Sequence, residues 1–312
     1  MTATKKRPRN LTSHTELSKL AQCEMSWKLR YVDGVKGEPS DPMWLGTLVH
    51  RGAAAISLGG DWRQALAEAI TEEGADPSLV VLEALDADTP AATARWLLER
   101  YERHYADDLA DVTVVAQELD LRATIPGTKQ VHQAIIDEVW DVAGDIWVVE
   151  RKTFGRNDRL DYVEVDPQLT NNLWVARANG IDAVGIVFDG IYTYRWKPEK
   201  PTLGAIEEKL VACGYQGTKK DLREQARGVQ ADESNWVERP DSDSFTRLWL
   251  DRQPEHVEAA QTEIRGAISR RNALRRGAHP TRNIGNNCRY CDQRSACWEM
   301  LAFPQEIVLD AD

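Results

Sequence analysis

The sequence predicts an α/β fold, in which helices flank a central mixed β-sheet. Helical patterns fill the first 110 residues, a β-rich stretch follows between residues 112 and 153, and a further strand comes after a helix. This order of elements is typical of a mixed sheet covered by helices. The chain has 312 residues, of which 42% are hydrophobic, which is enough for a sizeable core.

Helices dominate the N-terminal part. Apolar residues recur with helical spacing in 11–30, 43–57, 61–72 and 91–105. Ser13 or Thr15 suits the start of the first helix, and Cys23 lies on that helix or at its end. Turn-forming residues predict a loop over 34–42, and acidic turn signals over 76–90 leave room there for at most a short helix.

The middle of the chain reads as strands. Residues 112–125, 131–142 and 146–153 are rich in β-formers and are separated by Pro126-Gly127 and Ala143-Gly144-Asp145, which predicts an antiparallel meander. A helix is expected over 166–179. A strand pair or one long strand, broken around Asp189-Gly190, is expected over 183–196.

The C-terminal part reads as helical again. Helices are predicted over 203–213 and 219–228, and a long helical stretch over 244–276 is interrupted near Pro254. Basic residues cluster at 5–9 and again at 265–282. Such runs are either solvated helix faces or surfaces that follow phosphates.

Composition limits the class of protein. The net charge is -11, the isoelectric point is about 5.2 and the mean hydropathy is -0.51. The acidic balance argues against a general nucleic-acid coat. No apolar run approaches a membrane span, and the basic N-terminus has no apolar signal segment, so we expect a soluble cytoplasmic protein without membrane contact.

Four cysteines are the most specific feature of the sequence. Cys288, Cys291 and Cys297 form a C-x2-C-x5-C run, and Cys23 lies near the opposite end of the chain. In a reducing compartment, clustered thiols favour metal binding over disulfides. A four-thiolate site can hold a [4Fe–4S] cluster or zinc. The fifth cysteine, Cys213, is expected to be a buried structural thiol.

Acidic and basic residues also gather at strand ends. Glu150 and Lys152 are two residues apart in an extended segment and therefore face the same side. Pairing across the Ala143-Gly144-Asp145 turn brings Asp137 near Glu150, and two close carboxylates favour a divalent cation between them. The alternative is that all three are exposed salt-bridge residues on a sheet face.

Two further residues fit the same chemistry. His50 follows Gly46 on the second helix and is either structural or an imidazole ligand to the cation. Gln168 lies in the first turn of the helix over 166–179. It is either solvated or in contact with a phosphate or the attacking water.

Together these residues carry a family resemblance. The order Cys, Gly-x3-His, Asp, Glu-x-Lys, Gln and Cys-x2-Cys-x5-Cys resembles the PD-(D/E)XK nucleases of the RecB type. The branch it resembles most is the iron–sulfur exonucleases, which include the CRISPR-associated RecB-like nuclease and the AddB nuclease domain. The resemblance runs from Cys23 to Cys297 and implies a restriction-endonuclease-like core.

The resemblance implies roles for particular residues. It assigns Mg²⁺ or Mn²⁺ binding to His50, Asp137, Glu150 and the Arg151 carbonyl. Lys152 would position the nucleophilic water, with Gln168 assisting. The [4Fe–4S] ligands would be Cys23, Cys288, Cys291 and Cys297. Glu118 is a further candidate near the metal. The family commonly has a tyrosine where this chain has Asn172, and Trp174 is a candidate for its stacking role.

The resemblance also implies an organisation and a function. We expect a flexible basic arm (1–10), a helical region with Cys23 and His50 (11–110), a nuclease core (111–200) and a helical region with the cysteine run (201–312). The expected function is a metal-dependent DNA exonuclease that acts on single strands or duplex ends in recombination or repair, in a bacterium or a bacteriophage. Its partners would be a strand-annealing protein or a helicase, or further copies of itself.

Two other functions stay open from the sequence. A nuclease-like module could bind DNA or a partner protein without cleaving it. An iron–sulfur redox protein would leave Asp137, Glu150 and Lys152 unexplained. An absorbance spectrum separates an iron–sulfur cluster from zinc, and a cleavage assay separates an enzyme from a binding module.

Overall fold

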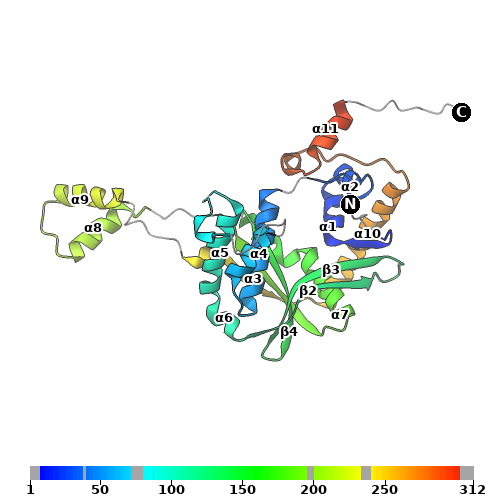
Figure 1. The fold of residues 1–312 in the computed structure, drawn as a ribbon, viewed down its shortest axis with the longest axis horizontal. Helices are drawn as coiled ribbons and strands as arrows, with labels where there is room; N and C mark the ends of the chain where they lie inside the picture. The colour runs from blue at the N-terminus through cyan, green and yellow to red at the C-terminus, as the bar shows by residue number, and fades with distance from the viewer. Residues whose placement is uncertain are drawn as a thin grey trace.

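A computed structural model describes residues 8–37, 40–71, 80–86, 88–155, 157–194, 200–232 and 240–302. Its centre is one six-stranded mixed sheet (Figure 1). The strands are β1 (Leu11–Ser13), β2 (Val112–Thr124), β3 (Val131–Val142), β4 (Asp145–Phe154), β5 (Ala183–Tyr192) and β6 (Phe245–Leu250). Helices flank this sheet, so the predicted α/β class with a central mixed sheet is confirmed.

The predicted antiparallel meander is present as β2, β3 and β4. Ala143 and Gly144 form the tight turn between β3 and β4, both with positive φ, as two-residue hairpin turns require. β4 then pairs with β5 in parallel, and β6 pairs antiparallel with β5 at the edge. The order along the sheet is β1-β3-β4-β5-β6, with β2 on the other side of β3.

The pairing of β3 opens a gap in the sheet. β2 runs along one edge of β3, while the other edge pairs with β1 near Val131 and with β4 only from Glu138 to Val142. The ladder between β3 and β4 therefore ends just before Asp137 and Glu150 would pair. This point, where the two strands part, positions the candidate site.

Helices cover both faces of the sheet. The helices are α1 (His14–Gln22), α2 (Glu24–Tyr31), α3 (Asp41–Ser57), α4 (Trp62–Thr71), α5 (Pro90–His104), α6 (Ala106–Ala110), α7 (Pro167–Ala178), α8 (Leu203–Ala212), α9 (Lys219–Ala231), α10 (Pro254–Arg275) and α11 (Arg294–Ala302). Short 3-10 helices are η2 (Leu82–Ala84), η3 (Asn157–Val165), η5 (Asp241–Asp243) and η6 (Asn286–Tyr290). The main core joins α7 and α10 to the sheet, and a second core joins α3, α4 and α5 to Ile191 and Phe245.

The predicted single helix over 11–30 is wrong. Residues 11–13 form β1, and the rest is split into α1 and α2. Cys23 stands between these two helices in extended conformation, at φ -164° and ψ 116°. Ser13 caps α1 and accepts a hydrogen bond from the Glu16 N–H, as the sequence predicted.

Two predictions near the sheet edge are also wrong. β5 runs unbroken through Asp189-Gly190, and Phe245–Leu250 is strand β6 rather than part of a helix. Gly190 fits inside the strand because a Cβ there would lie 2.6 Å from the Phe188 ring and 3.0 Å from the Phe154 ring. The sheet therefore includes β1 and β6, which lie outside the expected core of residues 111–200.

The basic stretch 265–282 serves mainly internal contacts. Arg271 is fully buried and donates to the Leu11 carbonyl, while Arg270 pairs with Glu24 and Arg275 with Glu16. These contacts join α10 to α1 and α2, which lie side by side in Figure 1. The fully buried Arg271 therefore cannot belong to a phosphate-tracking surface, while Arg270 and Arg275 are engaged in ion pairs with glutamates. The other basic run, residues 5–9, falls mostly outside the described residues.

Helices α8 and α9 form a hairpin inserted between β5 and β6. In Figure 1 it stands apart from the sheet and the other helices. Thr218 begins α9 with a capping box, sharing hydrogen bonds with Asp221. Cys213, at the end of α8, is exposed, so the prediction of a buried thiol is wrong. Among the described helices, none is long and apolar enough to cross a bilayer.

Candidate functional site

The candidate active site is centred on Glu150, near the end of β4. The residue is 2% exposed. Lys152 lies on the same face of the strand, and its Nζ forms an ion pair with Glu150 Oε1. From α7, Gln168 Nε2 donates a hydrogen bond of 2.6 Å to Oε1, and Asn172 Nδ2 donates one of 2.5 Å to Oε2. Three donors therefore converge on one buried carboxylate.

The start of α7 brings two of these donors into place. Asp166 caps the helix, and its Oδ1 accepts a 2.9 Å hydrogen bond from the Gln168 N–H. Pro167 occupies the first turn, where its missing N–H costs nothing. Residues four apart share a helix face, so Gln168 and Asn172 reach Glu150 together.

Asp137 lies beside this carboxylate, where β3 and β4 part. Its Oδ2 accepts a 2.7 Å hydrogen bond from the Arg151 N–H, which therefore binds a side chain instead of the β3 backbone. Its Oδ1 lies 3.6 Å from Nδ1 of His50, which α3 supplies. The structure thus brings Asp137, Glu150, Lys152, His50 and Gln168 to one place.

The two carboxyl groups have different pKa values. Burial is the main cause that raises the pKa of Glu150 to about 7; the Lys152 ammonium opposes this rise and the charge of Asp137 adds to it. Burial also acts to raise the pKa of Asp137. The hydrogen bond and charge of His50, with the Arg151 N–H, outweigh it, so the pKa of Asp137 lies below its ordinary value. Such opposed shifts in two adjacent acids, one buried and one partly buried, are typical of functional sites.

The donor set fits a hard divalent cation. Two carboxylates, an imidazole and the Arg151 carbonyl supply oxygen and nitrogen ligands of the kind that Mg²⁺ and Mn²⁺ accept. A buried and a partly buried acid side by side favour a positive charge between them. In the part of the chain that the structure describes, no three His, Cys, Asp or Glu side chains stand close enough to share one ion as placed. The oxygens of Glu150 instead bind protein donors.

The side chain of Arg151 belongs to a buried ion-pair network that the sequence did not predict. It points to the opposite face of β4 from Glu150 and is 1% exposed. Its guanidinium pairs with Glu138 at 3.2 Å and with Asp189 at 2.9 Å. Asp189 also accepts a 2.6 Å hydrogen bond from the Tyr101 hydroxyl. An aspartate within the apolar run of β5 was the available signal for this network.

The two minor candidates differ in where they lie. Glu118 stands between Gln117 and Leu119, which pair with Glu138 and Ile136, so its position in β2 is opposite Asp137; it is exposed and has φ of 51°. Trp174 is buried in the main core, with its ring centroid 6.0 Å from that of His132. The suggested stacking role of Trp174 is therefore wrong. Asn172, the departure from the family pattern, contacts Glu150 directly.

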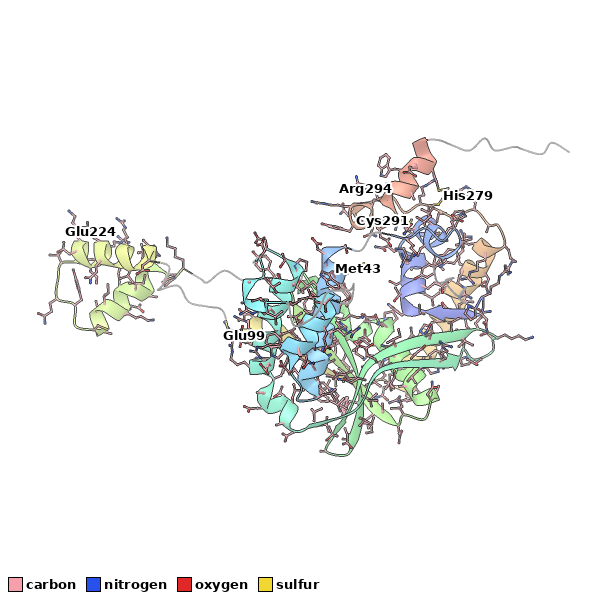
Figure 2. The ribbon with its side chains drawn as sticks, in the orientation of Figure 1. Met43, Glu99, Glu224, His279, Cys291 and Arg294 are labelled. Carbon is pink, nitrogen blue, oxygen red and sulfur yellow. The ribbon has the colours of Figure 1, made fainter. Side chains whose placement is uncertain are left out.

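The four predicted cysteine ligands line one cavity of about 160 Å³, together with Ile284 and Trp298 among others. The cavity lies between the α1–α2 junction, which supplies Cys23, and the lobe formed by η6 and α11. Figure 2 labels Cys291 and Arg294 in this lobe. As placed, no three of the thiols are close enough to share one metal ion, within the residues the structure describes.

Polar contacts hold this lobe against the N-terminal segment. Lys19 Nζ lies 2.5 Å from Asp292 Oδ1, and Gln293 Nε2 donates a 3.3 Å hydrogen bond to the Val35 carbonyl. The Ser26 hydroxyl lies 3.5 Å from the Cys291 sulfur. Segments more than 250 residues apart in sequence are thus joined around the cysteine cavity.

A protein family and two solved structures are similar to this chain. The model of the PD-(D/E)XK nuclease superfamily matches residues 12–298. A solved structure from Eubacterium rectale, provisionally described as an exonuclease, aligns with a TM-score of 0.51 at 12% identity, covering 90% of this chain and 88% of that one. The structure of SSO0001 aligns with a TM-score of 0.40 at 9% identity, covering 93% and 87%. No curated protein matches the chain.

Proposed function

Because the chain belongs to the PD-(D/E)XK nuclease superfamily, we propose that it is a metal-dependent DNA exonuclease that hydrolyses phosphodiester bonds at single-stranded or duplex ends. One observation carries the proposal. Glu150 is buried at the point where β3 and β4 part, with Asp137, His50 and Lys152 around it. A buried acid with its pKa raised to about 7 beside a second acid is costly for the fold, and a cation-dependent reaction accounts for it.

Each residue has a proposed role in the reaction. His50, Asp137, Glu150 and the Arg151 carbonyl would hold Mg²⁺ or Mn²⁺, which when bound polarises phosphate oxygens and acidifies water. Lys152 would orient the attacking water and stabilise charge on the phosphate. Gln168 holds Glu150 in place. Water adds to phosphorus and one P–O ester bond breaks, which leaves a phosphate monoester and a hydroxyl that takes up the proton.

We also propose that Cys23, Cys288, Cys291 and Cys297 hold a [4Fe–4S] cluster with a structural role. Support comes from the convergence of these four thiols on one cavity, although they are not contiguous in sequence. Four thiolates would suit zinc as well, and the family resemblance is the reason for preferring iron–sulfur. A context in recombination or repair, beside a helicase or a strand-annealing protein, would follow from activity on DNA ends.

Cleavage of end-labelled DNA tests the proposed activity. Anaerobically purified wild-type protein and Lys152→Ala are given single-stranded and duplex DNA with Mn²⁺, Mg²⁺ or EDTA. We expect cleavage that EDTA abolishes and that Lys152→Ala reduces about 100-fold or more. Lys129→Ala removes an exposed lysine from the β2–β3 turn and should leave cleavage unchanged. Binding of DNA without cleavage by the wild type would instead favour the non-cleaving module.

A further inference from the structure

A second cavity, of about 650 Å³, is lined in part by residues of β4 and α3, the two elements that also supply Glu150, Lys152 and His50. Phe154, at the end of β4, forms part of its wall and lies on the same strand face as Glu150 and Lys152. Leu45, on α3, forms another part and precedes His50 by five residues. Lys152 and Phe154 are about 7 Å apart along the strand, and Leu45 and His50 about 7.5 Å apart along the helix. The cavity is thus within one or two nucleotides of the catalytic groups.

Two exposed tyrosine rings line this cavity from different lobes. Tyr162 belongs to η3, after β4, and is 47% exposed. Tyr290 lies between Cys288 and Cys291 in η6 and is 78% exposed. Figure 2 labels Met43, the neighbour of the lining residue Pro42, and Cys291, the neighbour of Tyr290. Exposed aromatic rings facing one cavity beside a nuclease site are typical of stacking platforms for unpaired bases.

The polar lining suits a base rather than a phosphate. Asp41 and Asp88 contribute carboxylates, and neither has an ion pair or side-chain hydrogen bond within the described residues. No lysine or arginine is among the described residues that line the cavity. Carboxylates repel phosphate but accept hydrogen bonds from the amino groups of cytosine, adenine and guanine. The volume lies within the range of pockets that enclose a ligand of nucleoside size.

We propose that this cavity, bounded by Phe154, Tyr162, Tyr290, Asp41 and Asp88, binds one unpaired nucleobase of the DNA strand, stacked on the tyrosine rings. The inference rests on the proposed function, because it names the substrate of that same site. A base in this cavity cannot be paired, so the site selects single strands or frayed duplex ends. Tyr162 and Tyr290 are then specificity-determining residues rather than catalytic ones.

A scan with abasic sites tests the cavity without depending on cleavage. The Lys152→Ala protein is titrated with a short labelled single strand that carries one abasic position at a time near its end, and the Kd is measured by fluorescence anisotropy. We expect one position at which the lost base weakens binding about 5- to 100-fold. Adding Tyr162→Ala and Tyr290→Ala should remove this sensitivity, whereas Tyr162→Phe with Tyr290→Phe should retain it.

Matched controls make the result specific. Tyr215→Ala removes a ring from the α8–α9 hairpin, outside the cavity, and should leave the abasic scan unchanged. Both target rings are exposed, so their removal should not unfold the protein, and thermal unfolding checks this. The proposal is overturned if the Kd of the Lys152→Ala protein is the same for every abasic position. It is also overturned if the tyrosine-to-alanine changes leave the position-specific effect intact, or if no strand binds.

Cleavage by the wild type on the same unmodified strand separates the two proposals. If the wild type cleaves the strand but the Kd does not depend on the abasic position, the proposed base-binding cavity is wrong and the proposed nuclease activity is supported. A position-specific scan that depends on the tyrosines, without cleavage, overturns the nuclease and supports the pocket.

Discussion

At the scale of single residues, the donors around Glu150 decide how the site works. A carboxylate buried to 2% exposure stays ionised only if its oxygens are hydrogen-bonded. Lys152 and Gln168 occupy one oxygen and Asn172 the other. Asn172 therefore belongs to the functional arrangement, although it touches no substrate in our proposal.

Replacing Asn172 with leucine should lower kcat selectively. Oε2 of Glu150 would lose its donor, the neutral acid would be favoured, and fewer molecules would carry an ionised site at neutral pH. We expect kcat to fall about 10-fold or more while the Kd for single-stranded DNA changes less than about 2-fold. Asn171→Leu is the control, because Asn171 is about as buried, whereas the α7 amide groups that bind Glu150 are those of Gln168 and Asn172. Wild-type kcat in Asn172→Leu would contradict this positioning role.

Arg151 stabilises the opposite face of the same strand. Arg151→Met would leave Glu138 and Asp189 buried with fewer donors, and breaking a buried ion pair from one side costs about 3–5 kcal/mol. Urea unfolding measures the loss. Asp189→Asn added to Arg151→Met should recover part of it, because one uncompensated charge is removed. A decrease of less than about 1 kcal/mol in the free energy of unfolding would show that the contacts of Tyr101 and Arg247 are enough to stabilise the buried Asp189 carboxylate.

Residue-level prediction from the sequence succeeded where a simple geometric rule applied. Glu150 and Lys152 share a face because strands alternate, and the short Ala143-Gly144 turn sets the register that brings Asp137 alongside. The network of Arg151 with Asp189 and Tyr101 was missed because its members are far apart in sequence. No local pattern indicates that three polar side chains will meet inside a core.

At the scale of elements, two strands show why secondary structure was partly mispredicted. In β6, Arg247 occupies a position facing inwards, where it reaches Asp189 at 3.4 Å. A charge at an inward position conceals the alternation that marks a strand. In β5, Asp189-Gly190 imitates a turn, yet the aspartate is paired and the glycine makes room for phenylalanine rings. Tertiary contacts outweighed local propensity in both strands.

The junction between α2 and α10 gives a prediction about pH. Glu24 accepts hydrogen bonds from Arg270 and Thr281, and its pKa is lowered to about 2, mainly by the Arg270 hydrogen bond. A carboxylate with a lowered folded pKa stabilises the fold fully above its ordinary value of 4.5, and that contribution is lost as pH falls towards 2. Glu24→Gln should therefore lower the Tm at neutral pH, with the difference shrinking below pH 4.5.

Thermal unfolding of both proteins across this pH range measures the effect. Glu258→Gln, on an exposed position of α10, is the control and should shift the Tm little at any pH. A Tm difference that stays constant down to the lowest pH would show that Glu24 acts through packing rather than charge.

At the scale of the whole molecule, the two ends of the described chain meet at the cysteine cavity. Cys23 comes from the break between α1 and α2, and the other three cysteines come from η6 and α11. The sequence predicted this meeting from the cysteine spacing, but not the split helix that exposes Cys23 to the lobe. Crosslinking segments so far apart restricts the unfolded chain strongly. A bound cluster would therefore act mainly on stability.

Cysteine-to-serine variants test whether the thiols that line this cavity bind a cluster and stabilise the fold. We expect anaerobic wild-type protein to be brown and to contain iron and sulfide, and Cys23→Ser to lose this colour together with several degrees of Tm, because one ligand and the link between distant segments are both lost. Cys213→Ser is the matched control, since this thiol is exposed at the end of α8. It should keep both colour and Tm. If the wild-type protein is colourless and contains zinc, the four thiols bind zinc rather than an iron–sulfur cluster. An unchanged Tm in Cys23→Ser would mean that the polar contacts from Lys19 and Gln293 are enough to hold the lobe.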